Sequence, residues 1–164
     1  MKDFETICVA SGVQIVSAPA NRFKTNEISI SFCTPLSAKT ASRNALCANL
    51  LARTTKKYPT LSEFNKKLAM LYGASVTCSV AKLGENQLLT LNASSLDDRF
   101  SFENDKISVD AFNLLMSMVF DANVDENGLF YPQDIDREKR LLAEKIESEE
   151  NEKRIYSLLS LIHI

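Results

Sequence analysis

The chain has 164 residues, of which 45% are hydrophobic and 24% charged, and its formal net charge is -2. This length is typical of one soluble globular domain with a substantial core, and the near balance of 19 basic and 21 acidic residues argues against a basic surface that binds nucleic acid. No apolar run reaches the roughly 18 residues of a membrane span or resembles a signal peptide, so we expect a cytoplasmic protein with no nucleic-acid or membrane partner.

The N-terminal third of the chain carries strand patterns followed by a helix pattern. Residues 5–34 are predicted to form strands, and Ile28, Ile30 and Phe32 alternate there with polar or small residues. Residues 38–53 are predicted to form a helix that is apolar nearly all round. Such a helix is expected to be covered on most sides.

The next helix has clear start and stop signals. Thr60 is followed three residues later by Glu63, which is the pattern of a capping box. Gly73 lies where a glycine commonly ends a helix in the left-handed conformation. These signals predict a helix between Thr60 and Gly73.

The second half of the chain repeats the order of strands and then helices. Residues 76–80 and 89–93 alternate as an antiparallel hairpin, and a polar loop is expected around 97–106. Helices are predicted over 108–120 and from about residue 133. The order predicts an α+β fold, in which helices cover an antiparallel or mixed sheet.

The histidine and cysteine counts restrict the chemistry. His163 is the single histidine, whereas zinc enzymes usually use two or three and Ser–His or Cys–His catalysis needs an imidazole held in place. The four cysteines, Cys8, Cys33, Cys47 and Cys78, form no C-x-x-C pair. They are interpreted as reduced, buried thiols.

Residues 54–59, T-T-K-K-Y-P, are similar to the connector that follows the zinc-binding helix of pitrilysin/insulinase-type metallopeptidases, the inverzincins. Active members carry H-x-x-E-H on that helix. The resemblance places the first zinc-binding histidine at Ala45, the catalytic glutamate at Ala48 and the second histidine at Asn49. These side chains cannot replace the zinc ligands or the general base.

Three further segments carry the same resemblance, at residues 11–16, 71–75 and 137–146. In the last of these, Glu138 fits the accessory glutamate of the family, and the third zinc ligand falls on Lys145. A lysine ammonium has no lone pair to offer a metal. A shift of one position would place Glu144 there, but one carboxylate without histidines makes no zinc site.

The resemblance implies an incomplete N-terminal domain of the LuxS/pitrilysin-peptidase-like fold over residues 1–157, within a family whose full members have two such domains. It points most closely to a catalytically degenerate branch. Residues 158–164 change abruptly in character and are expected to be a non-native tail.

The function implied by the resemblance is that of a non-catalytic subunit without a cofactor or metal. It would form a heterodimer with a paralogue that bears H-x-x-E-H, complete a chamber that holds a peptide or protein substrate, and be linked to modification of elongation factor P. One alternative is a zinc metalloendopeptidase with unconventional ligands, such as Cys47 with Glu138 or Glu144. Another is a structural subunit like the core subunits of respiratory complexes. Asn49 is interpreted as a satisfied core amide.

Overall fold

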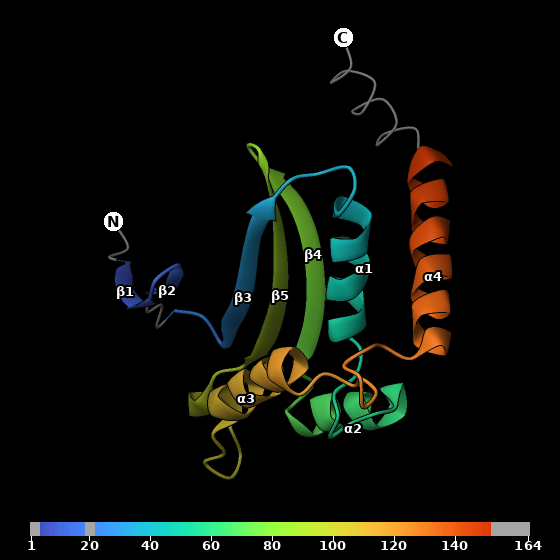
Figure 1. Cartoon of the computed structure of the whole chain (residues 1–164). Coiled ribbons are helices and arrows are strands. Elements are labelled where there is room, and N and C mark those ends of the chain that lie inside the picture. The colour runs from blue at the N-terminus through green and yellow to red at the C-terminus, as the bar shows by residue number, and fades with distance from the viewer. Residues whose placement is uncertain (1–3, 19–21, 152–164) are drawn as a thin grey trace.

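The computed structural model describes residues 4–18 and 22–151, without the side chains of 149–151 (Figure 1). The predicted boundary at residue 157, the tail at 158–164 and His163 lie outside this range. Within the described part, no helix is both long and apolar enough to cross a membrane.

A three-stranded antiparallel sheet forms the centre of the molecule. Its strands are β3 (Thr25–Pro35), β4 (Ser75–Leu83) and β5 (Asn86–Leu96), in the order β3-β5-β4. Leu91 of β5 lies opposite Ile30 on one side and Cys78 on the other. Both pairings are antiparallel, which confirms the predicted arrangement. The alternation seen in the sequence places one set of side chains on the face of the sheet that the helices cover.

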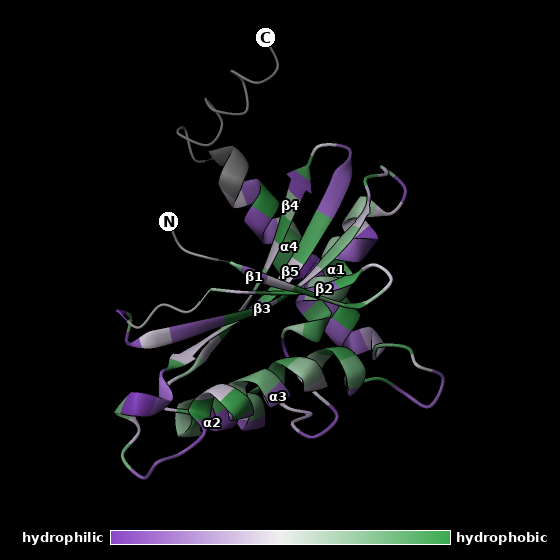
Figure 2. Cartoon of the chain, turned by 90° about the vertical axis from the view of Figure 1, so that its left-hand side faces the viewer, coloured by the Kyte–Doolittle hydropathy of each residue, from purple (hydrophilic) through white to green (hydrophobic). Residues whose placement is uncertain are grey.

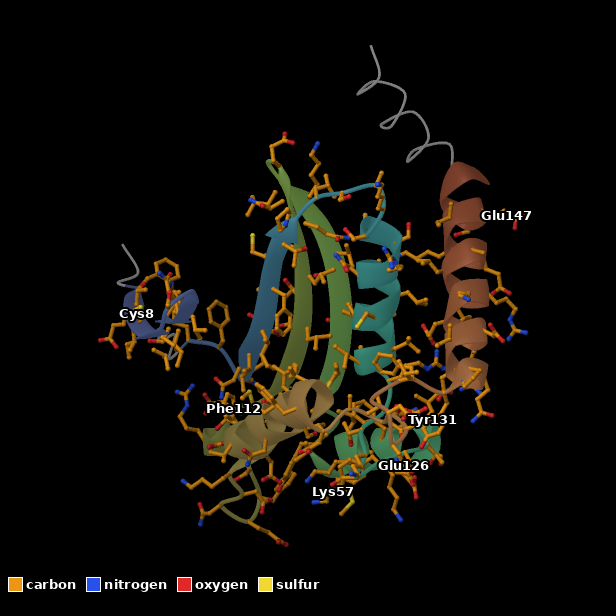
Figure 3. The ribbon with its side chains drawn as sticks, in the orientation of Figure 1. Cys8, Lys57, Phe112, Glu126, Tyr131 and Glu147 are labelled. Atoms are coloured by element: carbon orange, nitrogen blue, oxygen red, sulfur yellow. The ribbon has the colours of Figure 1, made fainter. Side chains whose placement is uncertain are left out.

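The first two strands form a separate antiparallel hairpin. Strand β1 (Glu5–Ala10) pairs with β2 (Val13–Ser17), with Ile7 opposite Ile15. Every described residue of the hairpin is exposed, and Figure 3 shows the side chains around Cys8 standing apart from the rest of the molecule.

The four α-helices of the described residues lie on one face and at one end of the central sheet (Figure 1). Helix α1 (Ala41–Leu51) lies against the sheet, and α4 (Pro132–Asn151) lies on the far side of α1 (Figure 1). Helices α2 (Leu61–Met70) and α3 (Ile107–Phe120) gather at one end of the sheet. The α+β fold with helices on an antiparallel sheet agrees with the prediction.

The core lies between the sheet, α2 and α3. Leu91 and Ala93 of β5 are each 2% exposed, and they pack in one cluster with Phe64, Leu115 and Met118. Figure 2 shows the mostly apolar α3 running along the end of the sheet. Burial of these side chains is the main term that stabilises the fold.

The capping box at the start of α2 is confirmed. The Glu63 backbone N–H donates to Thr60 Oγ1 at 3.2 Å, and the Thr60 backbone N–H donates to Glu63 Oε2 at 3.1 Å. One short element was missed: a 3-10 helix, η1 (Asp98–Phe100), forms within the predicted polar loop. Asp97 initiates it by accepting a hydrogen bond from the Arg99 backbone N–H at 2.9 Å.

Two predictions about burial were wrong. Only Ala48 and Leu50 of α1 are fully buried, because the sheet and α4 leave the side of Cys47 open. The cysteines are free but not buried: Cys8, Cys33 and Cys47 are exposed and Cys78 is half-buried. The apolar residues around this helix therefore led to a prediction of more burial than the structure shows.

Candidate functional site

The start of α1 is held to the sheet by Gln87. Its Nε2 donates to the backbone oxygen of Ala41 at 3.0 Å, and its Oε1 accepts from Asn44 Nδ2 at 3.0 Å. Gln87 is 4% exposed, so these hydrogen bonds satisfy a buried amide. Sequence reasoning missed Gln87. The available signal was a polar residue in register with the inward-facing positions of β5.

The connector at residues 54–59 is a tight turn anchored by one buried side chain, that of Thr55. Thr55 is fully buried, and its Oγ1 accepts a hydrogen bond from the Tyr58 backbone N–H at 3.1 Å. The Lys56 backbone N–H donates to the Asp121 oxygen at 2.8 Å. These bonds tie the connector to the segment after α3 and fix the direction in which α1 ends.

A cleft of about 270 Å³ opens between α1, β4 and α4. We call it the α1–α4 cleft. Its lining includes Asn49 and Arg53 from α1 and its end, Cys78 from β4, and Glu138, Leu142 and Lys145 from α4.

The α1–α4 cleft brings together two of the four predicted degenerate positions. Asn49 and Lys145, far apart in the sequence, both line it. Ala48 is buried at 4% exposure and Ala45 is half-buried on α1, and neither lines the cleft. Asn49 is half-buried, and its interpretation as a satisfied core amide stays a prediction.

An ion pair forms part of the wall of the α1–α4 cleft. Arg53 Nη1 donates to Glu138 Oε1. Glu138 is 5% exposed, and the pair links the end of α1 to α4. The carboxylate that the resemblance assigns to the accessory position is therefore bound to an arginine. Arg53 was not predicted from the sequence, since nothing in its spacing marks it as the partner of Glu138.

The two thiols near the cleft are not activated. The pKa of the Cys78 thiol is raised, mainly because burial disfavours the thiolate. The nearby positive charge of Lys145 lowers this pKa and Cys47 raises it, but the net change is an increase. Desolvation also raises the pKa of Cys47, even though part of its side chain is exposed. A raised pKa reduces the fraction of reactive thiolate near neutral pH, which disfavours either cysteine as a nucleophile or a metal ligand.

The residues of the cleft do not fit a zinc ion. No group of three or more His, Cys, Asp or Glu side chains that could hold a metal is found in the described part of the chain. Glu138 is engaged by Arg53, and Glu144 is exposed, with its Oε1 3.7 Å from Arg140 Nε. The ammonium of Lys145 would repel a cation. The alternative site of Cys47 with Glu138 or Glu144 thus has no geometric support.

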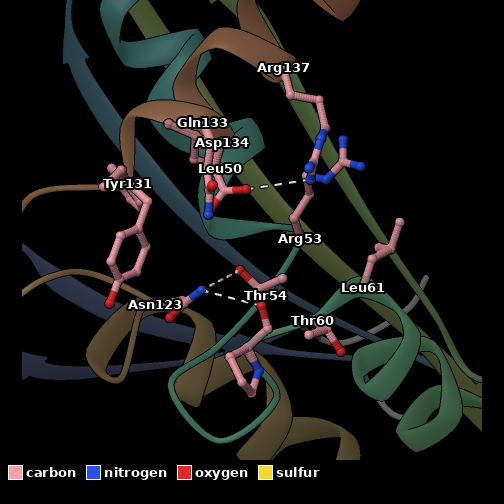
Figure 4. Close-up of a pocket in the computed structure, with 12 residues that line it drawn as sticks. Leu50, Arg53, Thr54, Thr60, Leu61, Asn123, Tyr131, Gln133, Asp134 and Arg137 are labelled. Carbon is pink, nitrogen blue, oxygen red and sulfur yellow. Dashed lines mark hydrogen bonds and ion pairs between the residues drawn. The ribbon is translucent and has the colours of Figure 1, made fainter.

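A second cavity of about 470 Å³ lies beside the connector, and Arg53 lines it as well (Figure 4). Several of its polar groups are already engaged by protein partners. Asp134 lies 3.4 Å from Arg137, and Asn123 Nδ2 donates to Thr54 Oγ1 at 3.5 Å. We therefore consider it a weaker candidate for a functional site.

Comparison with known proteins gives a consistent picture. No protein-family model matches the chain. Over 141 residues, which cover 86% of this chain, it is 28% identical to a Bacillus subtilis (strain 168) protein named "Probable inactive metalloprotease YmfF". A crystal structure of a conserved protein from Enterococcus faecalis V583 superposes with a TM-score of 0.86, at 25% identity, over 96% of this chain.

These matches confirm the resemblance to a catalytically degenerate metallopeptidase homologue and the peptidase-like fold. The chain spans 33% of the length of the Bacillus relative and 37% of the Enterococcus chain. The matches do not address the individual positions Ala45, Ala48, Asn49 and Lys145. Their assignment to the lost zinc site stays a prediction.

Proposed function

We propose that this chain is part of a non-catalytic subunit that pairs with an active zinc-peptidase paralogue and forms with it a peptide-binding chamber. The observation that carries the proposal is the meeting of Asn49 and Lys145 at the α1–α4 cleft. An amide and an ammonium stand where the resemblance places two zinc ligands. The inactive status printed in the name of the Bacillus relative supports the same view.

The edge of the central sheet supports a role in holding peptides. Strand β4 is the last strand in the order β3-β5-β4, so its outer edge has no partner among the described strands. Cys78 of β4 also lines the α1–α4 cleft. An extended peptide that adds to the edge of β4 by backbone hydrogen bonding would therefore run close to the cleft.

Pairing and activity can be tested on the full-length protein that carries this chain. It is purified alone and together with an H-x-x-E-H paralogue, and mass in solution, zinc content and peptide cleavage are measured. We expect a heterodimer in which the paralogue supplies the zinc and the activity. As a control, replacing the paralogue's H-x-x-E-H glutamate with glutamine removes cleavage but keeps the heterodimer. Stoichiometric zinc on this protein alone, or peptide cleavage by it alone, contradicts the proposal.

The link to modification of elongation factor P belongs to the same proposal. Deleting the gene is expected to change the mass of the modified elongation factor P, measured on the intact protein. An unchanged mass removes this part and leaves the pairing untouched. The alternative of a structural core subunit instead predicts that the protein co-purifies with a membrane complex.

A further inference from the structure

The second cavity, beside the connector, lies where several segments of the chain meet, and we call it the connector cavity. Its walls come from the end of α1, the connector and the start of α2, the segment after α3, and the start of α4 (Figure 4). Its volume of about 470 Å³ falls within the roughly 300–1,000 Å³ that is typical of pockets for small ligands. The cavity can therefore hold a side chain of a peptide.

The charged groups at the connector cavity compensate one another. Arg53, which lines it, forms its ion pair with Glu138. Arg137 and Asp134 also line it, and the Arg137 Nη1 lies 3.4 Å from the Asp134 Oδ1. Because these two guanidinium groups and two carboxylates sum to no net charge, the cavity offers no excess of charge to an ionic ligand. We therefore expect a neutral ligand.

Pairing with a carboxylate leaves the flat faces of a guanidinium group available. The hydrogen-bond donors of a guanidinium point outward in its plane, whereas an aromatic ring stacks on its face by cation–π attraction. The Arg137 side chain is 48% exposed and that of Arg53 is 25% exposed. Figure 4 shows Arg137 reaching from α4 toward the end of α1. Arg137 is therefore the better placed of the two to stack on a ring.

Apolar side chains supply the other surface that a ring would contact. Leu61 is 42% exposed and Tyr131 is 38% exposed, and both line the connector cavity, as does the half-buried Phe130. Covering such apolar surface with an apolar ligand is favourable, and aromatic rings gain further from packing on one another. An aromatic side chain makes both the apolar contacts and the stacking contact with a guanidinium, whereas an aliphatic side chain makes only the first.

We propose that the connector cavity binds an aromatic side chain of a peptide, with the ring stacked on the Arg137 guanidinium and packed against Tyr131. The inference rests on the proposed function in one respect, that peptides are held at this protein. It does not depend on Asn49 or Lys145, which line the α1–α4 cleft and not this cavity.

The test is a fluorine NMR titration of three peptides with the full-length protein that carries this chain. The probes are N-trifluoroacetyl-Ala-Phe-Ala-amide and its leucine and glutamate counterparts, so that all three carry the same reporter group. Binding broadens the trifluoromethyl resonance, and the titration gives the Kd. We expect the phenylalanine peptide to bind about fivefold more tightly than the leucine peptide, because leucine lacks the stacking interaction. The glutamate peptide is expected to bind more weakly than either.

The variants assign the site. Arg137→Met retains a long side chain without the guanidinium and is expected to weaken the phenylalanine peptide about fivefold, with little effect on the leucine peptide. Arg140→Met, at an exposed arginine of the same helix outside the cavity lining, is the matched control and leaves binding unchanged. Tyr131→Ala is expected to weaken the phenylalanine peptide severalfold. Its control is Leu129→Ala, at a nearby residue that is 63% exposed and does not line the cavity.

Three results overturn the inference: equal affinities of the phenylalanine and leucine peptides, tightest binding of the glutamate peptide, or unchanged binding by both Arg137→Met and Tyr131→Ala. Heterodimer formation is measured in parallel on the same protein. If the heterodimer forms while the phenylalanine peptide does not bind, the inference fails and the proposed function stands. If that peptide binds while no heterodimer forms, the reverse holds.

Discussion

Helices α3 and α4 pack against the molecule in opposite ways. On α3, Leu115 and Met118 have no exposed surface and pack into the core with Leu91 of β5. On α4, the one fully buried residue among the described side chains is Glu138, which pairs with Arg53. Figure 3 shows Glu147 on the outer side of α4, pointing away from α1.

The difference separates the part of the molecule that holds the fold from the part that can bind. Apolar burial at α3 strongly stabilises the fold but provides no polar or charged group for binding. The contact between α1 and α4 leaves a cleft and places charged groups around it. A binding site is therefore expected at this second kind of contact.

The largest loss of stability is expected from a substitution in the contact between α3 and the sheet. Leu115→Ala should lower the free energy of unfolding by about 4 kcal/mol, since it removes buried methyl groups and leaves a cavity. Chemical denaturation checks the value. Phe120→Ala, at a residue of the same helix that is 73% exposed, should cost less than about 1 kcal/mol. Equal effects would show that α3 is not held by apolar burial.

Breaking the ion pair between α1 and α4 should lower the free energy of unfolding somewhat less than Leu115→Ala does. Arg53→Ala is expected to lower the free energy of unfolding by about 3 kcal/mol, because Glu138 is left as a buried, unpaired charge. The partial exposure of Arg53 places the value at the lower end of the usual range.

The matched controls for this pair are a double replacement and a surface ion pair. Arg53→Met combined with Glu138→Leu should recover most of the loss. Arg140→Ala, which breaks an exposed pair with Glu144, should change stability by less than about 0.5 kcal/mol. A loss after Arg53→Ala no larger than this control would refute the structural role of the pair.

A smaller effect is expected at the start of α2, outside both contacts. Thr60→Ala removes the side-chain acceptor of the capping box and should cost about 1 kcal/mol. Ser62→Ala, at an exposed position of the first turn, is the control and should be nearly neutral. A neutral Thr60→Ala would mean that the cap contributes little to the fold.

The smallest expected effect is on the reactivity of Cys78, through the positive charge of Lys145. Lys145 lowers the pKa of Cys78, so Lys145→Met should raise that pKa, reduce the thiolate fraction at pH 8 and slow alkylation of Cys78 by iodoacetamide. Mass spectrometry of each labelled cysteine gives the rates, and Lys139→Met is the control. Unchanged or faster labelling of Cys78 would place Lys145 away from the thiol.

The elements of the fold were predictable because their signals are local. The alternation around Ile30 and Leu91, and the pairing of Thr60 with Glu63, each depend on residues close in sequence. The ion pair of Arg53 with Glu138 was not predictable, because it joins two helices whose approach depends on the whole fold.

The candidate site was likewise only partly predictable from local sequence signals. A family resemblance was needed to relate Asn49 to Lys145, since no periodicity connects them, and the structure then places both at one cleft. The exposure of Cys47 was mispredicted, because composition shows that a helix is apolar but does not show which of its sides is covered.

The most direct test of the lost zinc site is to restore it. The variant Ala45→His, Ala48→Glu, Asn49→His and Lys145→Glu returns both histidines, the general base and the third ligand to their predicted positions. Zinc content is measured by mass spectrometry on this variant, on the unaltered protein and on a control that keeps Lys145. We predict stoichiometric zinc in the full variant, weaker binding in the control and none in the unaltered protein. Stoichiometric zinc in the unaltered protein, or none in the full variant, would contradict the account.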